Sequence, residues 1–204
     1  MPGWFLDRAE REGTFPVIAI GMGDTLGFSG STGTIFGFGS ESSGHHALCG
    51  PWSITSTESG DEINADCEGG SGDTALFGVW EGWEENVSAG TVVVDATAQT
   101  GFSSPSQVET FSLDSSQSFT GGTDYFLGFA YDGDDYLLVD ANDDASSGID
   151  TACGAGSYTG GDSLSTMAAA PGTVYNDVRC RIWITTAAGG GGSTILPMLN
   201  HYMR

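Results

Sequence analysis

The sequence predicts an all-β fold, a sandwich or barrel of short strands with a short arm at each end. Three observations support this prediction. Glycine supplies 33 of the 204 residues, and Ser, Thr and Asp supply much of the remaining polarity, which disfavours helices because these residues fit helical backbone poorly or compete for its hydrogen bonds. Apolar residues recur with a period of two, which is typical of strands. Turn residues separate the apolar runs at spacings of roughly 8–12 residues, as in sandwiches and barrels.

The strand-like runs follow one another along most of the chain. They lie within residues 15–22, 23–40, 52–57, 74–83, 90–99, 107–114, 125–131, 135–141, 163–170 and 179–187. Glycine, proline or polar clusters stand between them and indicate turns. The run 74–83, TALFGVWEGW, is apolar on both faces, so we expect it to form a buried central strand.

The segment 118–131, SFTGGTDYFLGFAY, leads into the most apolar run of the chain. Gly121 and Gly122 allow positive φ angles and therefore a sharp turn. Apolar residues then occupy both faces of the run, so we expect a strand between two sheets, or between a sheet and a neighbouring subunit. Because burying one Phe or Leu contributes about 1.5–3 kcal/mol, we assign this strand to packing rather than to a binding site.

The chain divides into an N-terminal arm (1–15), a β-sandwich domain (16–188), a glycine linker (189–193) and an apolar C-terminal tail (194–204). Both ends carry large apolar side chains, which a free tail would leave in water. They must pack on their own sandwich or insert into a neighbouring subunit, and we expect the second. The residues expected to make these assembly contacts are Trp4, Phe5, Leu6, Ile195, Leu196, Met198, Leu199 and Tyr202.

The chain carries 27 acidic and only 5 basic residues, a formal net charge of −22. Such a surface repels phosphate backbones and anionic lipids, so we expect neither nucleic acid nor membrane as a partner. No apolar run approaches the roughly 18 residues of a membrane span, and the opening MPGWFLDRAEREG lacks the apolar stretch of a secretory signal. Solubility, tolerance of salt or binding of divalent cations would each explain the acidity.

The acidic run 131–150, YDGDDYLLVDANDDASSGID, is the best candidate for a calcium site. Asp140, Asn142 and Asp144 occupy the first, third and fifth positions of a calcium-loop-like spacing, where hard oxygen ligands can converge on Ca²⁺. The glycine and the bidentate glutamate of such a loop are missing. The alternative is a solvated acidic loop between strands, and no other cofactor is expected.

Trp80 and Trp83, in WEGWEEN, alternate with acidic residues, a pattern that suggests sugar stacking beside carboxylates. The alternative is that both rings belong to the core or to an interface. A glycosidase needs two carboxylates across a cleft, and neither a GxSxG elbow nor a nucleophile–base pair can be identified. We therefore expect no enzymatic activity.

The four cysteines, Cys49, Cys67, Cys153 and Cys180, are far apart in the sequence and have no zinc-binding spacing. Two alternatives are open. They form the disulfides Cys49–Cys67 and Cys153–Cys180, or they are buried thiols, as in a protein made in a cytoplasm.

Three segments occur in an order that resembles a jelly-roll sandwich module: TALFGVWE, then GTVVVDATAQ, then VETFSLDSSQSFTGGTDYFLGFAYDGD. In such modules an ALY-type strand precedes a GTLV-type strand, and a later hairpin leads into a central strand. The modules occur in virion structural proteins of tailed bacteriophages, in tail fibres and in secreted carbohydrate-binding or anchoring proteins. The resemblance spans residues 70–135 and implies a jelly-roll-like antiparallel β-sandwich more directly than it implies a role.

Together these features lead us to expect a non-enzymatic virion structural protein of a tailed phage. It would decorate or cement the head or the tail, through contacts of its arms with copies of itself and with other virion proteins. A closed ring such as a trimer would bury exchanged arms reciprocally. The protein would then be made in the host cytoplasm and reside in the virion. The alternative is an extracellular carbohydrate-binding or adhesion module, with or without a dependence on calcium.

Overall fold

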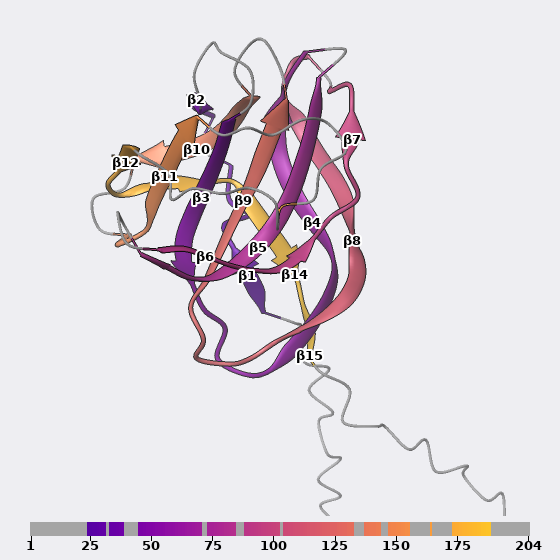
Figure 1. The fold of residues 1–204 in the computed structure, drawn as a ribbon, viewed down its shortest axis with the longest axis vertical. Helices are drawn as coiled ribbons and strands as arrows, with labels where there is room; N and C mark the ends of the chain where they lie inside the picture. The colour runs from indigo at the N-terminus through magenta and orange to yellow at the C-terminus, as the bar shows by residue number, and fades with distance from the viewer. Residues whose placement is uncertain are drawn as a thin grey trace, which may run out of the picture.

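The computed structural model describes residues 24–31, 33–38, 45–70, 73–84, 88–102, 104–132, 137–143, 147–155, 164 and 173–188. Within these residues no α-helix occurs, and two antiparallel sheets face each other as a sandwich (Figure 1). The prediction of an all-β sandwich is confirmed, and a single barrel is excluded. The jelly-roll connectivity stays a prediction. In this part of the chain no helix has the length and hydropathy needed to cross a membrane.

The first sheet has 8 strands, with β4 at its centre. Strand β8 pairs with β4 along one side, and β14, β10 and β15 pair with β4 along the other. Its strands are β1 (Thr25–Gly27), β2 (Ile35–Phe38), β4 (Glu58–Glu68), β8 (Gln107–Phe119), β10 (Leu137–Asp143), β13 (Val178–Cys180), β14 (Ile182–Thr185) and β15 (Ala187–Ala188).

The second sheet has 7 strands in the order β12-β11-β3-β9-β5-β6, with β7 added to β5. Its strands are β3 (His45–Trp52), β5 (Thr74–Glu84), β6 (Ser88–Asp95), β7 (Gln99–Thr100), β9 (Tyr125–Asp132), β11 (Asp150–Ala155) and β12 (Thr173–Tyr175). The central position of β9, between β3 and β5, places the most apolar run of the chain in the middle of this sheet.

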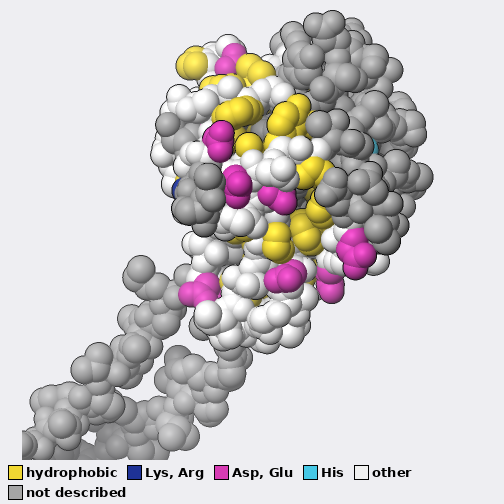
Figure 2. Space-filling view, turned by 90° about the vertical axis from the view of Figure 1, so that its left-hand side faces the viewer, with side chains coloured by type: hydrophobic (Ala, Val, Ile, Leu, Met, Phe, Trp, Pro, Cys, Tyr) yellow, Lys and Arg dark blue, Asp and Glu magenta, His cyan; other side chains and the backbone are white. Residues whose placement is uncertain are grey.

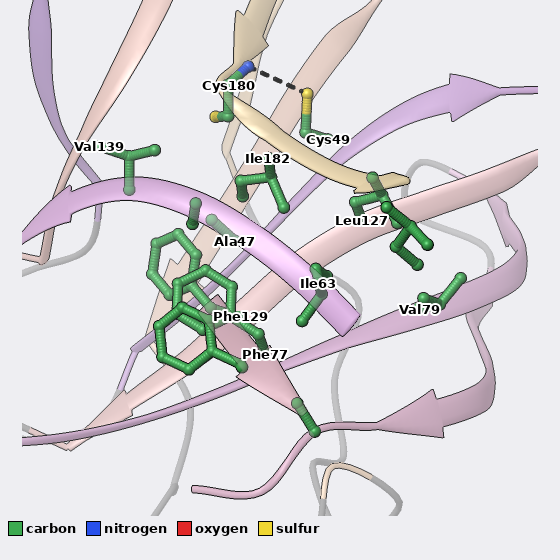
Figure 3. Packing of buried hydrophobic residues seen from close by; sticks show 14 of the residues in the cluster. Ala47, Cys49, Ile63, Phe77, Val79, Leu127, Phe129, Val139, Cys180 and Ile182 are labelled. Atoms are coloured by element: carbon green, nitrogen blue, oxygen red, sulfur yellow. Dashed lines mark hydrogen bonds between the residues drawn. The ribbon is translucent and has the colours of Figure 1, made fainter. Parts of the chain in front are cut away.

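The main core lies between the two sheets and is aromatic at its centre (Figure 3). Phe77 of β5 stacks on Phe111 of β8 across the sandwich, with ring centroids 4.3 Å apart. Phe129 of β9 lies 5.5 Å from the same Phe77 ring. Since each such side chain contributes about 1.5–3 kcal/mol on burial, the alternate residues of β5 and β9 hold the two layers together.

A second apolar cluster covers the outer face of the second sheet, and we call it the outer cluster. Its buried members are Leu48, Leu76, Trp80, Phe126, Ala130 and Leu164. The strands β5 and β9 are therefore buried on both faces, as the sequence predicts for both. Close packing also explains Gly128, because a Cβ there would lie 2.0 Å from the carbonyl oxygen of Ala47 on the neighbouring strand.

The sharp turn predicted before β9 lies at the two glycines, but of the two only Gly122 has a positive φ. Gly122 adopts a φ of 76°, which favours glycine, and its N–H donates to the carbonyl of Ile54 at 2.8 Å. This contact also explains why the expected strand at 52–57 is wrong. β3 ends at Trp52, and Ile54 then packs in the core while its carbonyl completes the turn.

The structure contains all four cysteines as buried thiols. The expected disulfides Cys49–Cys67 and Cys153–Cys180 are therefore absent, and the thiol alternative agrees with the structure. The predicted arms, the glycine linker and the expected strand at 15–22 lie outside the described residues, as does the one at 163–170 except for Leu164. The domain boundaries at 15 and 188 stay predictions.

Candidate assembly site at the chain ends

The first and last parts of the described domain lie side by side. The backbone N–H of Thr186 donates to the carbonyl oxygen of Asp24 at 3.1 Å. The Thr186 hydroxyl lies 2.6 Å from the same carbonyl and also contacts the Glu58 carboxylate, so it donates to one of the two at a time. Residues 162 positions apart in the sequence are thus hydrogen-bonded.

The carboxylate of Glu58 joins the first described residue, Asp24, and Thr186, near the last described residue, to the start of β4. Its Oε2 accepts the backbone N–H of Asp24 at 2.9 Å, and its Oε1 accepts the Ser56 hydroxyl at 3.0 Å. The hydrogen bond from Thr186 lowers the pKa of Glu58, and the bonds from Asp24 and Ser56 act in the same direction. They outweigh burial, which acts in the opposite direction, because donors stabilise the charged form.

Strand β15 brings the C-terminal side of the domain to this same end. Ala188 pairs with Glu58, and Ala187 pairs with Ser59. In Figure 1 this strand lies at the lower end of the sandwich, whereas β2 lies at the opposite end. The first described residue, Asp24, and the last described strand, β15, therefore lie at neighbouring points of one end of the sandwich. We call this end, defined by Asp24, Glu58, Thr186 and β15, the terminal pole.

The proposed calcium ligands do not come together as a site in the described residues. Asp140 is buried, and its carboxylate lies 3.8 Å from a guanidinium nitrogen of Arg181, which also contacts Asp66. Asn142 is half-buried on β10, where it pairs with Arg179, and Asp144 lies outside the described residues. No group of three potential metal ligands occurs in the described ranges, and the calcium site stays a prediction.

The two tryptophans expected to stack on sugars belong to the outer cluster or pack against it. Trp80 is only 5% exposed, and Trp83 is half-buried with its ring centroid 5.4 Å from that of Phe126, edge to face. This environment is typical of packing residues. The structure brings the two rings to the same face, and their role as a sugar site stays a prediction.

Trp183, which the sequence did not single out, lies on the outer face of the first sheet. Ile182 and Ile184 on either side of it are buried in the core, so alternation turns Trp183 outward. Thr110, Asn64, Trp183 and Gly27 form one row across four strands. The Thr110 hydroxyl donates to Asn64 Oδ1 at 2.8 Å, and the Arg181 guanidinium lies 5.4 Å from the Trp183 ring centroid. The signal in the sequence was the alternation of RIWIT.

The acidity of the chain is visible at the surface. On the face shown in Figure 2, Asp and Glu side chains are scattered among polar and hydrophobic ones. The described cations act locally: Arg179 lies 4.2 Å from the Phe28 ring centroid, and Arg181 contacts Asp66. Both arginines thus stabilise the outer face of the first sheet.

The chain matches no protein-family model, no curated protein and no solved structure. The resemblance to jelly-roll modules of phage virions therefore stays a prediction.

Proposed function

We propose that this protein is a non-enzymatic virion structural protein that decorates or cements a phage particle, at the head or the tail, through subunit contacts made by its terminal arms. The observation that carries the proposal is the terminal pole, where Glu58 holds Asp24 and Thr186 together. The described part of the chain begins and ends at this pole, and in the sequence one apolar arm precedes it and the other follows it. The virion setting comes from the jelly-roll resemblance, and the arm mechanism comes from the apolar residues of 1–15 and 194–204.

Adjacent attachment points give the two arms a physical advantage in binding. Asp24 and Thr186 are hydrogen-bonded, so when one arm has bound a neighbouring copy, the other arm is tethered to a nearby point of the same domain. Its effective concentration at the same neighbour is then on the order of millimolar, as for short flexible linkers. Two weak apolar contacts at one pole would therefore act as one strong contact, and they would orient the sandwich with the opposite end away from the neighbour.

Deletion of residues 189–204 tests the proposal. We expect the full chain to form a discrete oligomer in light scattering, and the truncated chain to be a monomer with an unchanged β-type circular dichroism spectrum. The paired substitutions Ile195→Ser and Leu199→Ser should have the same effect without shortening the chain, because they remove only the apolar contacts.

Val108→Ser is the matched control. Val108 is an exposed apolar side chain, 43% accessible, near the start of β8 and away from the terminal pole. This variant should keep the mass of the full-length oligomer. A monomeric full chain, or a tail deletion that still forms the same oligomer, would contradict the proposed arm mechanism.

A second candidate function is carbohydrate binding on the outer face of the first sheet. Trp183 offers a partly exposed aromatic ring, and Asn64, Thr110 and Arg181 place hydrogen-bonding groups beside it. Flat aromatic rings flanked by polar groups suit sugar rings. A glycan array probed with the wild type, Trp183→Ala and Trp83→Ala distinguishes this face from the Trp83 site. Loss of glycan binding in Trp183→Ala alone supports this face. If the wild type binds no glycan, the function is rejected.

A further inference from the structure

Two cysteines, one from each sheet, are in contact in the interior of the sandwich. Cys49 lies on β3 of the second sheet, and Cys180 ends β13 of the first. The backbone N–H of Cys180 donates to Cys49 Sγ at 3.2 Å (Figure 3), and both residues are only 1% exposed. Thr151 lies beside them, with its Oγ1 at 3.4 Å from Cys180 Sγ and donating to the carbonyl of Val178 at 2.6 Å.

The other two cysteines are less well placed to react with this pair. Cys153 lies on β11 opposite Ala47, whereas Thr151 lies opposite Cys49. Among the causes that shift the pKa of Cys180, the charge of Cys153 ranks below burial and the effects of Cys49. Cys67 lies on β4 next to Asp66, and within the described ranges no thiol contact joins Cys67 to another cysteine. The geometry therefore selects one pair, which differs from both pairs expected from the sequence.

The two thiols of this pair are chemically unequal. Burial alone would raise the pKa of Cys49, but its hydrogen bonds, first among them the one with the Cys180 thiol, outweigh burial and lower it. Burial, followed by the neighbouring Cys49, raises the pKa of Cys180 well above its ordinary value. Cys49 is thus the better nucleophile of the two, since the thiolate is the reactive form.

We propose that Cys49 and Cys180 form an oxidisable pair that closes into a disulfide between the two sheets when a hydroperoxide reaches it. The Cys49 thiol first loses its proton, and the thiolate attacks the terminal oxygen of the peroxide. The O–O bond breaks, Cys49 becomes a sulfenic acid, and the hydroxide or alkoxide that leaves takes up the proton lost by the thiol to give water or an alcohol. The Cys180 thiol then attacks the Cys49 sulfur and the S–O bond breaks. The released hydroxide takes the Cys180 proton and leaves as water. The two electrons lost by the thiols reduce the peroxide.

Closure of this pair joins residues 131 positions apart and cross-links both layers of the core. A disulfide that closes so long a loop restricts the unfolded chain strongly, so we expect a rise in melting temperature of roughly 5–15 °C. A protein assembled under reducing conditions would thereby become more stable after exposure to an oxidising exterior. The inference does not depend on the proposed virion function, because it concerns the interior of the isolated chain.

The test treats the full-length protein with hydrogen peroxide. We expect thiol titration in denaturant to fall from four groups to two, and non-reducing peptide mapping to find Cys49 linked to Cys180. In the Cys153→Ser variant and in the Cys67→Ser variant, the number of titratable thiols should fall from three to one. Cys180→Ala should form no disulfide and should leave Cys49 as a sulfenic acid that dimedone captures.

Several results would overturn the inference. These are a Cys153–Cys180 or Cys49–Cys67 link, a disulfide between two chains, or four titratable thiols after treatment that oxidises exposed reference thiols completely. Peptide mapping of the wild type decides between these outcomes even if the Cys180→Ala variant fails to fold.

Discussion

The two sheets share one core, but their outer faces differ. The outer face of the second sheet is apolar and buried, with Phe126 and Trp80 beneath Leu164. The outer face of the first sheet is polar: Asp66 and Asp140 bind Arg181, and Asn64 accepts from Thr110. Hydrophobic burial therefore stabilises the outer face of the second sheet, whereas ion pairs and hydrogen bonds stabilise that of the first in part.

This difference explains why some strands are easier than others to recognise in the sequence. A strand that is buried on both faces has apolar side chains on both, as in parallel α/β sheets. A strand that is buried on one face alternates between apolar and polar residues, and its outward residues are polar or charged. Substitutions on the two outer faces should therefore destabilise the protein for different physical reasons.

The largest expected effect is on the first sheet. Arg181→Met leaves the buried carboxylates of Asp66 and Asp140 without their cation, and removing one partner of a buried ion pair costs about 3–5 kcal/mol. Urea unfolding monitored by tryptophan fluorescence measures the loss. Combining Arg181→Met with Asp66→Asn and Asp140→Asn should restore much of the lost stability.

The control is Thr110→Ala, which lies on the same face but is exposed, and it should cost about 1 kcal/mol or less. Equal losses for Arg181→Met and Thr110→Ala would contradict the role given to the ion pairs.

The next effect is on the second sheet. Leu164→Ala should destabilise by about 2–4 kcal/mol, because it opens a cavity above Gly78 and Trp80. Unlike Arg181→Met, this loss should not depend on salt between low and high ionic strength, since no charge is unpaired. Chemical denaturation at two salt concentrations checks both statements. A loss below about 0.5 kcal/mol would mean that Leu164 does not cover the sheet.

The smallest effect is at the terminal pole and depends on pH. The folded pKa of Glu58 is lowered, so its stabilisation is complete above its ordinary value of about 4.3 and is lost as the pH falls through the lower folded value. Glu58→Gln should therefore have a lower melting temperature than the wild type at neutral pH, and the two melting temperatures should converge in acid. The difference between their melting temperatures, followed from pH 7 to about pH 2.5, isolates Glu58 from the general relief of acidic repulsion. A difference that is independent of pH would contradict the assignment.

The sequence predicted the strands whose apolar pattern is continuous. The runs 74–83 and 125–131 correspond to β5 and β9, and the glycine turn before β9 also followed from residue types alone. The strand β4, ESGDEINADCE, was missed although it is the centre of the first sheet. Its outward positions are acidic or polar, and only Ile63, Ala65 and Cys67 mark its buried face. β3 and β11 were missed because glycine, alanine and histidine interrupt them.

The candidate sites depended on proximity that residue types do not encode. Spacing alone could not reveal that Asp140 binds Arg181, that Glu58 joins the two chain ends, or that Cys49 meets Cys180 rather than Cys67. By itself the sequence determined an acidic all-β sandwich with two apolar ends, because composition and period-two alternation act locally. Only the tertiary structure decided which carboxylates, thiols and aromatic rings lie together, because those contacts join residues that are distant in the sequence, such as Cys49 and Cys180, which are 131 positions apart.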